Sequence, residues 1–543
     1  MDSVTQEILG NALFAISEEM AVVEYRSSFS PIIREMLDFN CGLFDAQGRM
    51  VSHSEQIPAQ LGLMQFALKA ALHKHGGSLE AGDAILTNNP YLGGTHTNDL
   101  QIFMPIHVDG VLVGYAGSIA HHIDIGGTFP GTESAQTTEI YHEGVIFPAI
   151  KFVEAGRRNS AVEDIIRHNV RDPHSTIGDL GAQLAACKRG IERVTELCHR
   201  HGRDLVCEAM EGLLESTERR AGALFNSWPS RSVTVEGFMD DSGFEGTDPI
   251  RIRVTVTPGD GRLRVDFTGT SPQVQSGMNV PVASTAAGVY FAVRCFAGDS
   301  GVRQNDGLSR LIDIITEPGT LVNPTHPAAL SARHLATQRI SDLMIEALGQ
   351  LMPDKDVAAA HVSFPAWVFR AYDGRSGKDT LLADILGGGG GARSNADGDH
   401  ALDTYCSNCA ILPAEIAELE YPWRIDRTEL VDGSGGRGRF TGGMAMRRDM
   451  TLLADDADGM YYVEQTVAEF APRGRAGGES GAPGAALLRR AGETHWQSLP
   501  GKGYLRLKNP GPMELASLPH IDHQRRMVIC NPCQLALQIV GGK

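Results

Sequence analysis

Two short apolar runs joined by a turn most constrain what this chain can fold into. Apolar residues alternate with others over residues 100–105, Asp109-Gly110 supplies a turn, and residues 111–119 form a second apolar run. This pattern predicts a β-hairpin. A hairpin of this length returns the chain to its starting level, so the residues before its first strand and after its second strand are expected to meet.

Histidines and aspartates stand at both ends of this hairpin. His96 and Asp99 precede the first strand, and His121, His122 and Asp124 follow the second. Imidazole and carboxylate donors suit Zn²⁺, Mn²⁺ or Fe²⁺ and leave a coordination position open for water or substrate. The spacing alone is equally typical of loop residues that cap strand ends through hydrogen bonds. Glycine-rich flanks around both clusters favour a functional site, because they allow close approach of a ligand.

Length and charge limit the classes of protein to which the chain can belong. Its 543 residues exceed one hydrophobic core and predict two or three domains. A net charge of −18 argues against nucleic acid or an anionic membrane as partner. We find no apolar run of the length that crosses a membrane, and the acidic start does not resemble a signal peptide. Nine cysteines in a chain of this length indicate a reducing compartment, so we expect a cytoplasmic protein.

The order of the expected elements predicts an α+β fold. We expect a mixed multi-domain chain in which an N-terminal α/β metal-bearing domain precedes β-rich domains, with divisions at 1–230, 231–450 and 451–543. Helices are expected at 3–25, 60–75, 160–170, 179–200, 204–225, 283–296 and 332–351. Strands are expected at 39–52 (a hairpin), 84–87, 139–153, 250–256 and 263–267, with a β-rich remainder.

Three glycine clusters and two C-x-x-C pairs occupy the second half of the chain. The glycine clusters span 387–391, 433–443 and 474–484. Backbone N–H groups in such loops can cradle anions, but the chain has no G-x-x-x-x-G-K-[ST] sequence, so we expect tight turns and close packing. The pairs Cys406–Cys409 and Cys530–Cys533 lie too far apart for a zinc ribbon, and buried thiols are the favoured interpretation.

Motifs in order along residues 1 to about 450 identify a family resemblance. They include DFNCGLFDAQGRMV, NNPYLGGTHTND, AHHIDIGG, EIYHEGVIFP, DFTGTSPQVQSGMNVP, LGGGGGARSNADG and SGGRGRFTGG. The sequence resembles the hydantoinase B / acetone carboxylase alpha subunit family, which includes the second half of ATP-dependent 5-oxoprolinase. The resemblance implies a large metal-bearing subunit that works with a separate, hydantoinase A-like ATP-binding subunit in a hetero-oligomer.

The resemblance also implies a ligand set for one divalent ion, Zn²⁺ or Mn²⁺. Mapped by motif, the ligands are Asp38, His96, Asp99 and His121. His122 and Asp124 are then left for acid/base catalysis, with hydrogen bonding to the loop as an equal alternative. Acid/base candidates with weaker support, for which exposed strand positions are an equal explanation, are Glu139, His142 and Glu143.

Three functions remain open at this point. The first is ATP-dependent opening of a cyclic amide such as a hydantoin, 5-oxoproline or a lactam, after the partner subunit phosphorylates the amide oxygen. The second is ATP-dependent carboxylation of a ketone such as acetone or acetophenone, for which the chain is short. The third is a non-catalytic scaffold whose metal is structural.

Overall fold

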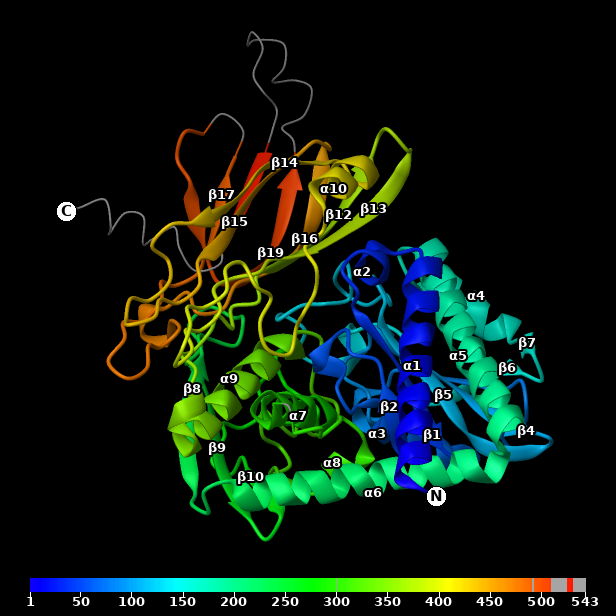
Figure 1. Cartoon of the computed structure of the whole chain (residues 1–543). Helices are drawn as coiled ribbons and strands as arrows, with labels where there is room; N and C mark the ends of the chain where they lie inside the picture. Colours follow the sequence, from blue (N-terminus) through cyan, green and yellow to red (C-terminus); the bar gives the residue numbers. More distant parts are fainter. Residues whose placement is uncertain (299, 491–492, 509–524, 531–543) are drawn as a thin grey trace.

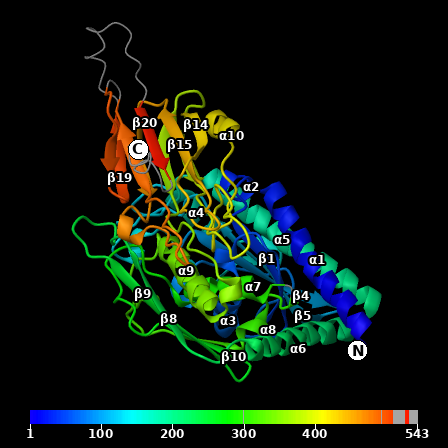
Figure 2. The same ribbon diagram turned by 60° about the vertical axis from the view of Figure 1, so that its left-hand side comes forward.

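Three hydrophobic cores organise the protein, each built around its own β-sheets. The structure is a computed structural model that describes residues 1–298, 300–490, 493–508 and 525–530, the last segment by its backbone alone. In Figures 1 and 2 the N-terminal unit and the central unit lie side by side, and the C-terminal strands form a separate layer against them. An α+β, multi-domain architecture is therefore confirmed. The predicted boundaries at residues 230 and 450 stay a prediction.

The N-terminal unit contains a seven-stranded antiparallel sheet in the order β2-β1-β5-β4-β3-β6-β7. Its strands are β1 (Phe39–Asp45), β2 (Met50–His53), β3 (Ala84–Thr87), β4 (Asp99–Val108), β5 (Val111–His121), β6 (Ile150–Glu154) and β7 (Arg157–Arg158). The predicted hairpin is β4–β5, and Asp99 pairs with His121 in its register. The ends of the hairpin therefore meet, as the sequence pattern requires.

Helices cover both faces of this sheet, which explains why its central strands are buried along most of their length. The helices of this unit are α1 (Ser3–Ser27), α2 (Pro31–Arg34), α3 (Met64–His75), α4 (Ser160–Asn169), α5 (Pro173–His201) and α6 (Arg203–Ser227). Leucine and methionine side chains of α1 share one core with β1, β4, β5 and α5, while α3 closes a second core on the other face. Every residue of β1 is buried. Strands enclosed on both sides lack the alternation of a half-exposed strand.

One expected strand is wrong over most of its length. The sequence pattern predicts extended chain over residues 139–153, but only β6 is a strand there, and η3 (Ile140–His142) begins the segment. Ile140 and Phe147 are buried without joining a ladder. The apolar side chains of this segment pack a loop against the core, and the chain changes direction at Gly144, where φ is +85°.

The central unit packs two long helices against a four-stranded sheet in the order β11-β10-β9-β8. Its elements are β8 (Val233–Met239), β9 (Ile250–Gly259), β10 (Arg262–Asp266), α7 (Val282–Ala297), α8 (Asp306–Ser309), β11 (Ile312–Ile315) and α9 (Arg333–Leu351). Burial alternates along β9 as the hairpin pattern predicts. Helix α6 joins this unit to the N-terminal unit, because Val206 and Met210 lie in the core that α1 and α5 share with the N-terminal sheet, whereas Phe225 lies in the core of the central unit.

The C-terminal unit is formed by two antiparallel sheets that share one core. Their strand orders are β13-β12-β16-β19 and β14-β15-β20-β17-β18. The elements are β12 (Ala366–Asp373), β13 (Lys378–Ile385), α10 (Ala414–Glu420), β14 (Trp423–Val431), β15 (Ala445–Leu452), β16 (Asp456–Tyr462), β17 (Ala485–Arg489), β18 (Gln497–Leu499), β19 (Lys502–Lys508) and β20 (Arg525–Cys530). Trp367 and Trp423, one from each sheet, lie in the shared core. Both sheets draw strands from either side of residue 450.

Short 3-10 helices occupy several connections between these elements. They are η1 (Pro58–Gln60), η2 (Pro90–Leu92), η4 (Pro353–Lys355) and η5 (Ala468–Phe470). Within the described residues, no helix combines the length and the apolar character needed to cross a membrane.

A buried carboxyl group ties α1 to the N-terminal sheet. Glu24 is fully buried, and its two oxygens accept hydrogen bonds from the Ser118 hydroxyl at 2.9 and 2.8 Å and from the Cys41 thiol at 3.1 Å. Burial raises the pKa of Glu24 to about 8, against the lowering effect of these hydrogen bonds. The carboxyl group therefore keeps its proton at neutral pH.

Replacement of this group should change how stability depends on pH. Because the pKa of Glu24 is higher in the folded chain (about 8) than its ordinary 4.5, its contribution is fully present below pH 4.5 and is lost as pH rises toward 8. In the wild type this loss of stability amounts to at most about 1.4 kcal/mol for each pH unit in this window. Glu24→Gln cannot ionise, so the variant should not show the loss. Thermal unfolding of both proteins at pH 6 and pH 8 measures the difference. Glu154→Gln, at an exposed position, is the control; an E24Q profile parallel to that of the control would contradict the assignment.

Candidate metal centre

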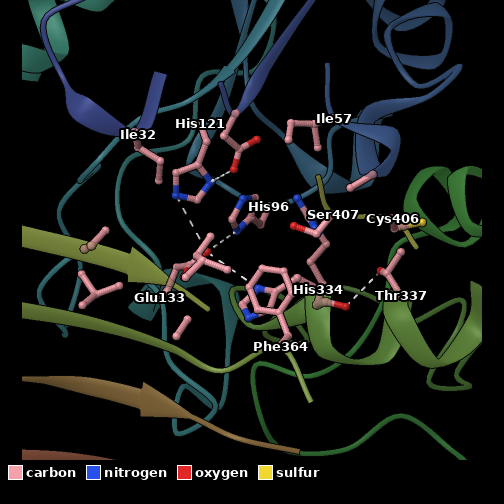
Figure 3. Close-up of a pocket in the computed structure, with 18 of the residues that line it drawn as sticks. Ile32, Ile57, His96, His121, Glu133, His334, Thr337, Phe364, Cys406 and Ser407 are labelled. Carbon is pink, nitrogen blue, oxygen red and sulfur yellow. Dashed lines mark hydrogen bonds and ion pairs between the residues drawn. The ribbon is translucent and has the colours of Figure 1, made fainter. Parts of the chain in front are cut away.

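The edge of the N-terminal sheet brings three of the four predicted ligands together through backbone pairing. Asp99 begins β4, His121 ends β5, and these two residues are partners in the hairpin register. Asp38 directly precedes β1, and its carbonyl oxygen accepts a hydrogen bond from the His121 amide at 3.0 Å. His96 lies in the loop before β4, three residues from Asp99. The sheet therefore fixes the backbone positions from which these side chains project, and Figure 3 shows two of them, His96 and His121.

Distances between the donor atoms match those of ligands around one ion. The Nε2 atom of His96 lies 3.2 Å from Oδ1 of Asp99, and Nδ1 of His121 lies 3.4 Å from the same oxygen and 3.9 Å from Oδ2 of Asp38. Neighbouring donors about 2.1 Å from a divalent ion lie roughly 3.0–3.5 Å apart. Asp99 therefore lies close enough to each histidine to share an ion with it, and Asp38 lies next to His121, although the assignment of these four residues as ligands stays a prediction.

The hydrogen bonding of His96 identifies which of its nitrogens is available. Its Nδ1 lies 3.1 Å from the carbonyl oxygen of Ser331, which can only accept, so Nδ1 carries the proton and Nε2 keeps its lone pair. Among the described residues, His96 Nε2 and Asp99 Oδ1 are buried atoms with no hydrogen-bond partner. Two unpaired buried acceptors that face each other fit a cation between them.

A third carboxylate, Glu133, approaches the two histidines from the opposite side. Donor atoms of His96, His121 and Glu133 all lie within 4.8 Å of one another. Oε1 of Glu133 is 3.6 Å from Nδ1 of His96, 3.9 Å from Nε2 of His121 and 3.8 Å from Nδ1 of His334. Burial raises the pKa of Glu133 to about 7, while His121 and Arg333 act to lower it. Glu133 is thus either an alternative ligand or a buried group poised to exchange a proton.

The start of α9 supplies two further cationic or ionisable groups, Arg333 and His334. Arg333 donates a hydrogen bond to Oδ2 of Asp99 at 2.8 Å, and the Thr95 hydroxyl donates to the same oxygen. Burial acts to raise the pKa of Asp99, but His96, His121 and Arg333 together hold it well below its usual range. Asp99 is therefore an anion with one oxygen held by Arg333 and the other facing both histidines.

Glu143 fixes the backbone that carries α9 to the site. Its Oε1 accepts hydrogen bonds of 2.8 Å from the amides of Leu330 and Ser331 and from the Thr137 hydroxyl. Ser331 in turn supplies the carbonyl that orients His96. Of the weaker acid/base candidates, Glu143 is thus buried behind the site, whereas Glu139 and His142 are exposed and lie 3.6 Å from each other.

His122 and Asp124, the two predicted catalytic residues, lie away from the donor cluster. His122 is buried, and its Nε2 contacts Oε1 of Gln183 on α5 at 3.1 Å. Asp124 accepts hydrogen bonds from the amides of Gly126, Gly131 and Arg171 and from the Arg171 guanidinium. Neither residue lines the cavity at the metal centre. Their catalytic assignment stays a prediction, and the contacts of Asp124 are those of a residue that fixes the loop leading to Glu133.

A cavity of about 50 Å³ borders the donor cluster. Its polar side includes Asp38, His96, His121, Glu133, Arg333 and His334. Its other side is apolar and draws on all three units: Ile32, Ile57, Ile123, Phe364, Val368 and Ile385. Figure 3 shows the two histidines and Glu133 facing Phe364 across this space. The site can therefore hold an ion against an apolar group.

The first C-x-x-C pair lies near the same cavity but does not form part of the donor cluster. Cys406 is buried, lines the cavity and lies 2.9 Å from the Ser341 hydroxyl. Cys409 is half-buried, and burial raises its pKa well above the usual value. The side chain of Cys530 and all of Cys533 lie outside the described residues, so a zinc site shared by the two pairs stays untested.

Sequence comparison places the chain in a family. The family model described as Hydantoinase B/oxoprolinase matches residues 2–516. The chain belongs to this family. It is 34% identical over 517 residues to a protein of Pseudomonas sp. (strain NS671) that is named as a putative subunit of a D-/L-hydantoinase, and the match covers 92% of this chain and 86% of that protein.

Other proteins similar to this chain differ in length and in the reaction that their names give. 5-Oxoprolinase 1 of Arabidopsis thaliana is 29% identical, and the match covers 90% of this chain but 39% of that protein. The ATP-dependent caprolactamase of Pseudomonas jessenii shares 25% identity with a TM-score of 0.88, over 98% of this chain and 90% of that one. Acetone carboxylase in a nucleotide-free structure shares the fold, with 16% identity and a TM-score of 0.86, over 98% and 75% of the two chains.

Substitutions can decide which carboxylate holds the ion. Asp99→Asn should weaken metal binding by more than about a hundredfold, because it removes the anion between His96 and His121. Glu133→Gln should change metal affinity by less than about tenfold, because Glu133 faces the protonated nitrogen of His96. Metal titration followed by elemental analysis measures both variants.

His142→Ala serves as the control for this experiment. His142 is exposed and outside the donor cluster, so its variant should bind metal as the wild type does. If Glu133→Gln loses the ion while Asp99→Asn keeps it, the ion lies on the Glu133 side of the histidines.

Proposed function

We propose that this protein is the metal-bearing subunit of an ATP-dependent amidohydrolase that opens a cyclic amide. The observation that carries the proposal is a buried cluster of two histidines and Glu133, with Asp38 and Asp99 beside the histidines, against an apolar cavity wall. A structure shared with an ATP-dependent caprolactamase over nearly the whole of both chains supports ring opening. The substrate class is a hydantoin, 5-oxoproline or a lactam.

The ATP chemistry is assigned to a hydantoinase A-like partner subunit. The chain contains no Walker-type phosphate loop. The name of the Pseudomonas relative designates a subunit of a hydantoinase. The chain also corresponds to 39% of the Arabidopsis 5-oxoprolinase, so other parts of that longer protein can contain what a partner supplies here. We therefore expect a hetero-oligomer in which the partner phosphorylates the amide oxygen.

Residues of the metal centre would divide the hydrolytic chemistry among them. His96, Asp99, His121 and Asp38 would hold a Zn²⁺ or Mn²⁺ ion, which supplies Lewis acidity and lowers the pKa of water. Arg333 keeps Asp99 ionised and in place. Glu133 would take the proton of the attacking water and deliver it to the ring nitrogen as the C–N bond breaks. This step leaves an acyl phosphate, which a second water would hydrolyse to the open-chain acid and inorganic phosphate. The apolar wall, including Ile57 and Val368, holds the aliphatic part of the ring and excludes bulk water.

Ketone carboxylation is the second candidate for the same site. Acetone carboxylase has the same fold, but a likeness at 16% identity supports the fold alone. The match covers 75% of that chain and 90% of the caprolactamase chain, which agrees with this protein being short for a carboxylase subunit. Ring opening is therefore the favoured reaction.

A substrate panel separates these two reactions. With the partner subunit, ATP and metal, we expect an open-chain acid from hydantoin, 5-oxoproline or caprolactam, formed together with ADP. Because ring opening adds water, labelled bicarbonate should leave no acid-stable label in the product. Chromatography of products and scintillation counting measure both outcomes. Acid-stable label with acetone or acetophenone, and no open-chain acid, would establish carboxylation instead.

Removal of one histidine separates a catalytic metal from a structural one. His96→Ala should lower kcat/KM by at least about a thousandfold while the complex with the partner still assembles, because the substitution removes a ligand at the reacting centre. Metal content, turnover and size-exclusion chromatography are measured together, with His73→Ala, at an exposed position of α3, as the matched control. Turnover that survives in a folded complex without metal would support the scaffold function.

A further inference from the structure

A second cavity, of about 430 Å³, lies apart from the metal centre in the C-terminal unit. All three glycine clusters line it, together with arginines from the same loops, and we call it the arginine–glycine pocket. Its arginines are Arg393, Arg437, Arg439, Arg473 and Arg475. The proposed function uses none of these residues.

Glycine is required in these loops because their backbones touch. A Cβ atom on Gly391 would overlap the carbonyl oxygen of Ala358, and a Cβ atom on Gly435 would overlap that of Gly442. The same is true of Gly443 against Asp399. Hydrogen bonds from Gly443 to Gly390 and from Gly442 to Gly436 cross-link the loops. The expected close packing is confirmed, and the pocket is therefore a built structure whose walls hold one another in place.

One wall of the pocket presents a run of unused backbone donors. The amides of residues 435–440 donate no hydrogen bond to any described residue, whereas the flanking amides of Ser434 and Thr441 do donate. Gly435 and Gly436 are half-buried. Consecutive N–H groups in a glycine-rich loop form concave sites that bind anions.

Arginines with unpaired charge stand on this same segment. Arg475 is paired with Glu346 at 2.7 Å, and Arg393 is paired with Asp399 at 3.3 Å. By contrast, Arg437 and Arg439 are exposed, and neither guanidinium group lies within 4.0 Å of a carboxylate oxygen of any described residue. The carboxylates that line the pocket are Asp356 and Glu479. The pocket is thus net positive on a chain whose net charge is −18.

We propose that the arginine–glycine pocket binds a phosphate-bearing small molecule. Guanidinium groups bind phosphate oxygens in bidentate, charge-assisted pairs, and the unused amides supply further donors. The cavity volume of about 430 Å³ is in the range of small-ligand sites and favours a small molecule over a flat protein contact. The proposal does not depend on the proposed function.

Isothermal titration of the full-length chain with inorganic phosphate and with AMP tests this site, and adenosine is the uncharged probe. Wild type should bind inorganic phosphate and AMP but not adenosine. R437A/R439A should bind both anions at least about tenfold more weakly. R437K/R439K, which keeps the charge without the bidentate geometry, should fall between the two.

Two controls locate the binding in this pocket. R167A removes an exposed arginine of α4 that has no ion pair among the described residues, and it should bind phosphate as the wild type does. H96A/H121A should also bind normally, which excludes the metal centre as the binding site. Equal unfolding temperatures for R437A/R439A and wild type show that the fold is intact.

Two outcomes would overturn the proposal. One is affinity for phosphate and AMP that is unchanged in R437A/R439A. The other is a wild-type chain that binds neither anion; if R437A/R439A then also weakens assembly with the partner subunit, the arginines belong to a protein interface instead.

Discussion

The metal centre depends on one carboxylate, Asp99, and on the two sets of contacts that its oxygens make. Oδ2 accepts from Arg333 of α9, and Oδ1 faces His96 and His121 of the N-terminal sheet. Because α9 lies in the central core, the donor cluster takes this geometry only when the two cores are docked. Loss of one partner from a buried ion pair costs several kcal/mol, roughly 3–5, because the remaining charge stays unpaired. The site and the interface therefore stabilise each other.

The sequence predicts those features of the site that depend on residues close together in the chain. Alternation and the Asp109-Gly110 turn are enough to place β4 and β5, and hence to bring Asp99 beside His121. The helix at 333–351 is likewise predictable from its spacing, but the contact of Arg333 with Asp99 is not, because 234 residues separate them. Glu133 lies in a loop without periodicity, so no pattern indicates it. Asp38 is identified as a candidate ligand only by the family resemblance.

Adjacent residues at a strand end show why sequence reasoning could not rank the histidines. Successive side chains of a strand point to opposite faces of the sheet. His121 thus faces the donor cluster, whereas His122 faces α5 and contacts Gln183. Both are buried, so burial does not distinguish them either. What distinguishes the two histidines is the face of the sheet to which each side chain points. What lies on each face depends on which helix packs there.

The segment 358–368 connects the two cavities of the protein. At its start, the amides of Ala358 and His361 donate to the carbonyls of Ala392 and Gly389 in the glycine loops. At its end, Phe364 and Val368 form part of the apolar wall opposite the histidines. Its backbone hydrogen bonds to the glycine loops therefore help to position one wall of the metal cavity. The C-terminal unit thus shapes the metal centre although it supplies none of the donor atoms.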